Sequence, residues 1–250
     1  MNTKQYLKRI NAPLEKPSLT SLAKLQKMHL QQVPFENLDV IRKVPIYLNL
    51  ETIYKKVVEM NRGGYCYELN GLFHSLLTDL GYTAHLISAT VLRPNGEWAK
   101  ADTHATILVY LDEPYLVDVG FGAATPRRPV PLNGIMKTDI GETYRIAQQT
   151  ERTYDLIREI DGVRRTLYRF SSDTKELVDF HEGCVFNQVS KDSTFTHTDI
   201  VALATETGRI TLQDHTLTKV INGVTEKTEL SPEEKEFALN NIFSLSLKYV

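Results

Sequence analysis

The sequence predicts an α+β protein in which a helical segment, an antiparallel β segment and a mixed segment follow one another. Apolar residues recur at three- and four-residue intervals within the first eighty positions, which is typical of amphipathic helices. From residue 84 they fall in short runs separated by turn-forming residues, which indicates strands. After residue 194, short strands lead into one last helix. We therefore divide the chain into units 1–83, 84–190 and 191–250.

The helices of the first unit are indicated by their apolar spacing and by the residues at their ends. Helices are expected after Ser18 and after Asn49, because serine and asparagine side chains cap helix N-termini. The clearest helix begins near Cys66, with apolar side chains at i, i+3, i+4, i+7, i+8 and i+11 from Leu69 onward. A glycine turn at 63–64 therefore delivers Cys66 into the start of a helix with one buried face.

Short strands are expected through the rest of the chain. They are 84–92, 103–111, 115–119, 143–148, 153–160, 164–170, 201–204, 209–212 and 216–221. Turns at 112–114 and 161–162 predict hairpins, so the middle unit is an antiparallel sheet or barrel. The last helix is expected at 232–245, because Ser231 can cap it and Pro232 suits its first turn.

The composition favours a small-molecule substrate. The chain has 250 residues, of which 42% are hydrophobic and 24% charged, with a formal net charge of −2. That near-neutral balance predicts neither a nucleic-acid partner nor an anionic membrane surface as partner. No apolar run approaches the roughly 18 residues of a membrane helix, and the first residues do not resemble a signal peptide, so we expect a cytoplasmic protein. Cys66 and Cys184 are then expected to be free thiols.

Cys66 is the better candidate for a reactive thiol. At the first turn of a helix, unpaired backbone N–H groups and the positive end of the helix dipole favour the thiolate, which is the nucleophilic form. A small buried cysteine with no chemical role is an equally ordinary explanation of this segment alone. Cys184 lacks a comparable helix start, and we interpret it as structural.

His104 and Asp118 are the candidate partners of that thiol. His104 opens one expected strand, and Asp118 lies inside an apolar one, where an unpaired carboxylate costs several kcal/mol. With the hairpin turn centred near residue 113, the two are expected to be close cross-strand neighbours. An aspartate can orient an imidazole, which in turn exchanges a proton with a cysteine. We therefore predict a Cys66-His104-Asp118 triad. A zinc site is a weaker hypothesis, because no pair of ligands has zinc-site spacing.

Four segments carry a resemblance to a known family. They are 34–38 (Pro-Phe-Glu-Asn-Leu), 62–70 (Arg-Gly-Gly-Tyr-Cys-Tyr-Glu-Leu-Asn), 103–105 (Thr-His-Ala) and 117–122 (Val-Asp-Val-Gly-Phe-Gly). In this order they resemble the arylamine N-acetyltransferases, over roughly residues 1–130. The resemblance implies a helical bundle, a β-barrel and an α/β lid. It also implies ping-pong acetyl transfer from acetyl-CoA, as cosubstrate, to arylamines, arylhydrazines or N-hydroxyarylamines, with no metal.

Carried over by motif, the resemblance implies a role for each triad residue. Cys66 would hold the acetyl group as a thioester, His104 would shuttle the proton and Asp118 would orient His104. The backbone N–H of Tyr67 is a candidate donor to the oxyanion. The candidate contacts with acetyl-CoA are Thr103, Phe121, Gly122 and Phe195. Arg127 and Arg128 could meet the phosphates of coenzyme A, or could be a solvated pair on a loop.

Phe35 and Glu36 are expected to be structural. Phe35 would pack between helices, and Glu36 would form an ion pair with Arg62. Two other functions compete with acetyl transfer: a transglutaminase-like or other thiol hydrolase with the same triad, and a non-catalytic binding module. The presence of all three triad residues disfavours the binding module. The expected partners are the acceptor amine and acetyl-CoA, and the chain is expected to be a monomer or a weak homodimer.

Overall fold

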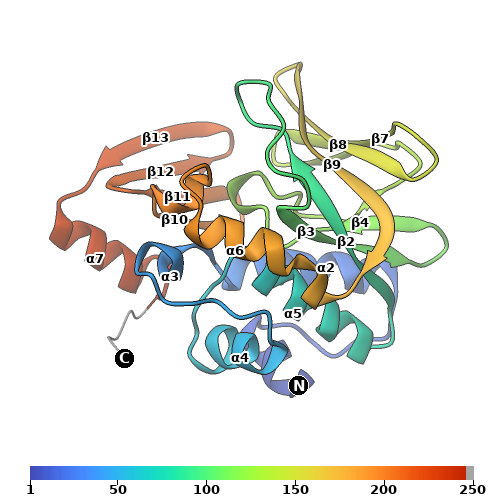
Figure 1. Ribbon diagram of the computed structural model, residues 1–250, viewed down its shortest axis with the longest axis horizontal. Coiled ribbons are helices and arrows are strands. Elements are labelled where there is room, and N and C mark those ends of the chain that lie inside the picture. Colours follow the sequence, from blue (N-terminus) through green and yellow to red (C-terminus); the bar gives the residue numbers. More distant parts are fainter. Residues whose placement is uncertain (246–250) are drawn as a thin grey trace.

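The computed structural model describes residues 1–245 and places two antiparallel sheets above a group of N-terminal helices (Figure 1). The helices are α1 (Thr3–Arg9), α2 (Leu19–Gln32), α3 (Leu38–Ile41), α4 (Leu50–Tyr54) with the π-helical turn η1 (Lys55–Glu59), α5 (Cys66–Asp79), α6 (His181–Val189) and α7 (Pro232–Asn241). Short 3-10 turns are η2 (Gly122–Ala124), η3 (Leu177–Phe180) and η4 (Thr194–Thr196). The expected succession of helical, β and mixed segments is confirmed.

The helix starts follow the capping residues that the sequence offers. The Ser18 side chain accepts a hydrogen bond from the Ser21 backbone at the start of α2, and Asn49 does the same for Thr52 at α4. At α7 the Ser231 hydroxyl accepts from the backbone N–H of Glu234, and Pro232 follows Ser231 as the first residue of the helix. The predicted end of α7 is wrong, because the helix stops at Asn241 rather than at 245. The apolar residues beyond it pack against the C-terminal sheet in a non-helical turn.

The larger sheet has eight antiparallel strands in the order β5-β4-β3-β2-β9-β8-β7-β6. The strands are β2 (Thr83–Val91), β3 (His104–Tyr110), β4 (Pro114–Val117), β5 (Val130–Pro131), β6 (Lys137–Asp139), β7 (Glu142–Gln148), β8 (Thr153–Ile160) and β9 (Val163–Lys175). Both predicted hairpins are present, β3–β4 and β8–β9. Helix α5 packs against β2 and β3, and this contact joins the helical segment to the barrel-like sheet.

The smaller sheet combines distant parts of the chain. Its order is β1-β10-β11-β12-β13, with β1 (Phe35–Glu36), β10 (Ile200–Thr205), β11 (Gly208–Gln213), β12 (Thr216–Ile221) and β13 (Val224–Glu229). The backbone of Phe35 therefore lies in a strand. Its ring meets that of Phe195 in η4 and lies beside Gly122 in η2, and its packing between helices stays a prediction. Strand β1 belongs to the helical segment but pairs with a strand of the C-terminal segment, so this sheet crosses the expected boundaries. The division into units 1–83, 84–190 and 191–250 stays a prediction. Residues 246–250 of the third unit lie outside the described residues.

A histidine is buried in the helical core without a polar partner. The ring of His29, on α2, meets Tyr6 of α1 at a centroid distance of 6.0 Å and Phe73 of α5 at 5.1 Å. Within residues 1–245, neither ring nitrogen has a hydrogen-bond partner. Burial lowers the pKa of His29 to about 3, and the nearby charge of Arg9 acts in the same direction. The ring is therefore neutral in the folded protein at any pH near neutrality.

Acid is expected to destabilise the protein through His29. In the unfolded chain this histidine takes up a proton near pH 6.5, whereas the folded protein resists protonation down to about pH 3. The unfolded state therefore binds more protons in this window, and stability is lost as the pH falls through it. Between pH 7.5 and pH 5, wild type should lose about 2 kcal/mol more than His29→Phe. Urea unfolding at both pH values measures this difference, and equal losses in the two proteins would contradict it.

Candidate active site

Cys66 is the first residue of α5 and is almost completely buried, with 3% of its surface exposed. The helix start is fixed by Glu68, whose carboxylate accepts a hydrogen bond from the backbone N–H of Tyr65 at 3.2 Å. Gly120 allows the end of the β4 segment to come close, because a Cβ there would lie only 2.7 Å from the Cα of Cys66. The sequence thus places the thiol where α5 meets the larger sheet.

His104 and Asp118 are in contact, as the hairpin predicted. The Nε2 atom of His104 lies 2.7 Å from Oδ2 of Asp118. The register pairs Ile107 with Val117, so the two side chains meet diagonally, just past the end of β4, and not as direct partners. Diagonal neighbours are still within reach of long side chains. The Nδ1 atom of His104 is thereby left for the thiol of Cys66.

Asp118 is fully buried and all its acceptor positions are used. Oδ2 also accepts from the Tyr168 hydroxyl at 2.9 Å, and Oδ1 accepts from Asn70 Nδ2 at 2.9 Å and from the Gly120 backbone at 2.8 Å. Sequence reasoning missed Tyr168 and Asn70. Asn70 had a usable signal, because it lies four residues after Cys66 on the same helix face. Tyr168 lies fifty residues after Asp118 on β9 and had none.

His104 and Asp118 each stabilise the charged form of the other. Burial would lower the pKa of His104, but the Asp118 carboxylate, with a further hydrogen bond to Cys66, outweighs it and raises that pKa to about 10. Burial would likewise raise the pKa of Asp118, but the imidazole, Asn70 and the Gly120 backbone hold it below its usual range. The site therefore favours an imidazolium–carboxylate pair beside the thiol.

A cleft of about 430 Å³ opens onto this triad. Its lining includes Cys66 and His104 together with all four residues proposed to contact acetyl-CoA: Thr103, Phe121, Gly122 and Phe195. The Phe121 ring lies 5.1 Å from the His104 ring, and the Phe195 ring lies 6.1 Å from that of Phe35. Gly122, at φ +72°, turns the chain beside the Phe35 ring, to which a Cβ would come within 3.3 Å.

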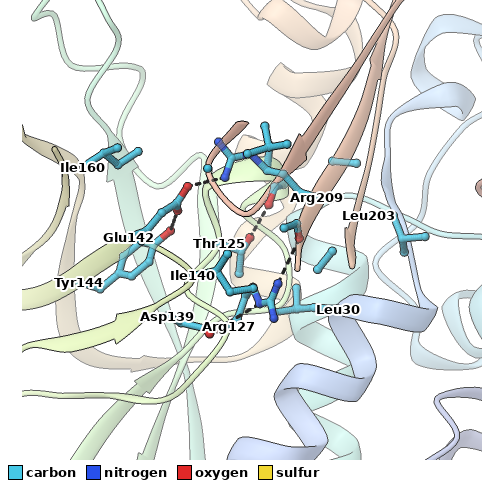
Figure 2. Close-up of a pocket in the computed structure, with 18 of the residues that line it drawn as sticks. Leu30, Thr125, Arg127, Asp139, Ile140, Glu142, Tyr144, Ile160, Leu203 and Arg209 are labelled. Carbon is cyan, nitrogen blue, oxygen red and sulfur yellow. Dashed lines mark hydrogen bonds and ion pairs between the residues drawn. The ribbon is translucent and has the colours of Figure 1, made fainter. Parts of the chain in front are cut away.

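A second cavity of about 460 Å³ (Figure 2) shares Phe35 and Gly122 with the first cleft as lining residues. Arg127 lines it, and its guanidinium donates to the carbonyls of Thr205, Glu206 and Gly208 and pairs with Asp139 at 3.1 Å. Arg127 is therefore a structural link between the η2 loop and the β10–β11 turn. Arg127 does not line the cleft of Cys66, so the expected contact with the phosphates of coenzyme A does not fit its position. Its side chain is largely buried, so the alternative, a solvated arginine on a loop, does not fit either.

The predicted ion pair of Glu36 and Arg62 is confirmed and belongs to a larger buried network. Arg62 Nη2 lies 2.8 Å from Glu36 Oε1 and 2.9 Å from Asp39 Oδ1. Lys56 lies 2.8 Å from Asp39 Oδ2 and 2.9 Å from Glu68 Oε1. Because Glu68 also caps the start of α5, the network is connected to the helix turn that carries Cys66.

Cys184 has a structural environment. Its Sγ lies 2.8 Å from the Tyr65 hydroxyl, and burial raises the pKa of the Cys184 thiol to about 11. The interpretation of Cys184 as structural therefore fits its surroundings.

Among residues 1–245 there is no group of three or more His, Cys, Asp or Glu side chains able to hold a metal ion. Nor is any helix in that range long and apolar enough to cross a bilayer.

The chain is similar to known proteins in both sequence and fold. The family model described as N-acetyltransferase matches residues 18–250. The chain is 32% identical over 229 residues to the arylamine N-acetyltransferase of Mycolicibacterium smegmatis, an alignment that covers 88% of this chain and 83% of that protein.

Two solved structures extend the likeness over nearly the whole chain. The Mycobacterium marinum arylamine N-acetyltransferase in complex with CoA has a TM-score of 0.91 and 32% identity, covering 98% of this chain and 93% of that one. A Bacillus cereus arylamine N-acetyltransferase is described as having a unique Cys-His-Glu catalytic triad. It has a TM-score of 0.92 and 28% identity, covering 99% of this chain and 100% of that one. In the present chain the carboxylate that contacts the histidine belongs to an aspartate, Asp118.

Proposed function

This chain belongs to the arylamine N-acetyltransferase family, and we propose that Cys66 is the residue that carries the acetyl group from acetyl-CoA to the acceptor nitrogen. The enzyme is an acetyl-CoA-dependent acetyltransferase. The observation that carries the residue assignment is the contact of His104 with Asp118 beside a buried thiol at a helix start.

In the first half of the reaction, the Cys66 sulfur attacks the thioester carbonyl of acetyl-CoA. An imidazolium beside a cysteine stabilises the thiolate, which is the attacking form. The C–S bond to Cys66 forms, the C–S bond to coenzyme A breaks, and His104 gives its proton to the departing thiolate. Asp118 keeps Nε2 of His104 engaged, so that Nδ1 faces the sulfur.

In the second half, the acceptor nitrogen attacks the Cys66 thioester. His104, now neutral, takes the proton from the nitrogen as the amide bond forms, and Cys66 leaves as the thiolate. Each tetrahedral intermediate carries a negative oxygen that needs a donor. The backbone N–H of Tyr67 is suited to this role, because N–H groups in the first turn of a helix have no acceptor within the helix.

The acceptors we propose are arylamines, arylhydrazines and N-hydroxyarylamines. The aromatic rings of Phe35, Phe121 and Phe195 support this choice, because they offer apolar faces to an aryl group in the cleft. The relatives support acetyl transfer and give no support to a thiol hydrolase. We further propose that the enzyme acts in the cytoplasm, where Cys66 stays reduced, as a monomer or a weak homodimer.

Steady-state kinetics test the proposed function. With acetyl-CoA and an arylamine both varied, release of coenzyme A should give parallel double-reciprocal lines, as two half-reactions on one thiol require. Cys66→Ala should abolish turnover, and the matched change Cys184→Ala should preserve it. Intersecting lines would contradict the covalent mechanism. Hydrolysis of an amide substrate without coenzyme A would favour the thiol hydrolase.

A further inference from the structure

Three arginines line the cleft that contains Cys66: Arg93, Arg158 and Arg165. Among residues 1–245, one carboxylate, that of Asp192, lines the same cleft. The cleft therefore carries an excess of positive charge, although the whole chain has a formal net charge of −2. A local excess of one sign in a cleft attracts ligands of the opposite charge.

Two of these arginines face each other on adjacent strands. Arg158 on β8 and Arg165 on β9 are direct cross-strand partners. Like charges in that position destabilise a sheet unless a counter-charge is present. Arg158 has one, because its Nε and Nη2 atoms lie 2.9 and 2.5 Å from the Glu142 carboxylate. Within residues 1–245, Arg165 forms no ion pair, and its side chain is exposed at the cleft.

The neighbouring residue on β9, Arg164, differs from Arg165 because it forms an ion pair. Arg164 lies beside Arg165 on β9, and its Nε atom is 2.7 Å from Glu159 Oε2. Successive side chains of a strand point to opposite faces, so Arg164 points away from the face on which Arg165 and Leu167 line the cleft. The unpaired charge of Arg165 thus lies on the face of the hairpin that lines the cleft containing Cys66.

We propose that Arg165, together with Arg93, binds the phosphate groups of acetyl-CoA. The inference rests on the proposed function and adds the residues that recognise the charged half of the donor. The thioester end must reach Cys66, and the apolar side chains of Phe121, Leu167 and Phe195 suit the uncharged arm behind it. Arg93 donates through Nη2 to the Asp192 carbonyl at 3.1 Å, which steadies its guanidinium and leaves other N–H groups for a phosphate.

Donors with and without phosphates test the inference. Arg165→Ala should raise the KM for acetyl-CoA about tenfold, the equivalent of one charge-assisted contact. It should leave the KM unchanged for S-acetyl-N-acetylcysteamine, a thioester that carries no phosphate. The matched variant Arg164→Ala should change neither KM. In the Cys66→Ala background, calorimetric titration with coenzyme A should show the same tenfold weakening for Arg165→Ala, independently of turnover.

Each other outcome overturns the inference. Equal losses with both donors would make Arg165 structural, and an unchanged KM for acetyl-CoA would remove it from the donor site. Equal effects of Arg164→Ala and Arg165→Ala would show a general charge effect of the hairpin. If the truncated thioester still acetylates Cys66, the proposed function stands even when the phosphate contact fails.

Discussion

Asp118→Asn is expected to lower the rate of Cys66 acetylation by about 10³- to 10⁴-fold without unfolding the protein. The Asp118 carboxylate accepts hydrogen bonds from His104, Tyr168, Asn70 and Gly120. An amide has only one acceptor oxygen, so its NH₂ group must face donors, and His104 loses the carboxylate that sets its tautomer and its charge. Rapid mixing with acetyl-CoA, without an acceptor, measures this half-reaction.

Asp155→Asn is the matched control. Asp155 is also a largely buried aspartate of the larger sheet, and it pairs with Arg169 at 2.7 Å away from Cys66. This variant should acetylate within a few-fold of wild type. A folded Asp118→Asn protein that reacts within tenfold of wild type would show that Asp118 does not orient His104, as would equal losses in both variants.

Glu36→Gln is expected to lower the free energy of unfolding by about 3 kcal/mol. The change leaves Arg62 buried with Asp39 as its remaining carboxylate, and Glu36 Oε2 also accepts from the Leu38 backbone at 2.8 Å. Removing one member of a buried charge network leaves its partner incompletely compensated. Urea unfolding of the variant and wild type at pH 7 measures the loss.

The exposed pair of Lys24 and Glu15, at 2.8 Å, provides the control. Glu15→Gln should change the unfolding free energy by less than about 1 kcal/mol, because an exposed pair contributes little. Correctly folded Glu36→Gln protein should keep most of its acetylation rate. A fully stable but inactive Glu36→Gln protein would reverse the interpretation and place Glu36 in the catalytic chemistry.

The triad was predictable because each of its members carries a local signal. A glycine turn before a strongly amphipathic helix located Cys66, and a hairpin turn brought His104 and Asp118 together. These features depend on residues close in sequence. The exact register did not matter, because the diagonal contact is as short as 2.7 Å.

The rest of the site depends on contacts that no local pattern encodes. Tyr168 reaches Asp118 only because β9 pairs with β2, which pairs with β3. Phe35 became a strand residue by pairing with Ala202, far along the chain. β13 was missed because all its side chains are exposed, so it shows no alternation of apolar and polar residues.

The arginine positions illustrate the same limit. Arg127 follows the segment of Asp118 closely in sequence, which made it an attractive phosphate contact, yet the chain turns at Gly122 and carries it into the other cavity. Arg165 gave no signal in the sequence, because its place at the cleft depends on the fold of the β8–β9 hairpin. Nearness to a catalytic residue in sequence was therefore a poor guide to nearness at the cleft.

Intact-mass spectrometry after incubation with acetyl-CoA tests the Cys66 thioester most directly. Wild type and Cys184→Ala should each gain one acetyl group, and an added arylamine should remove it. Cys66→Ala should gain none. An acetyl group that remains on Cys66→Ala, or a wild-type protein that turns over arylamine but never carries an acetyl group, would contradict the covalent role of Cys66.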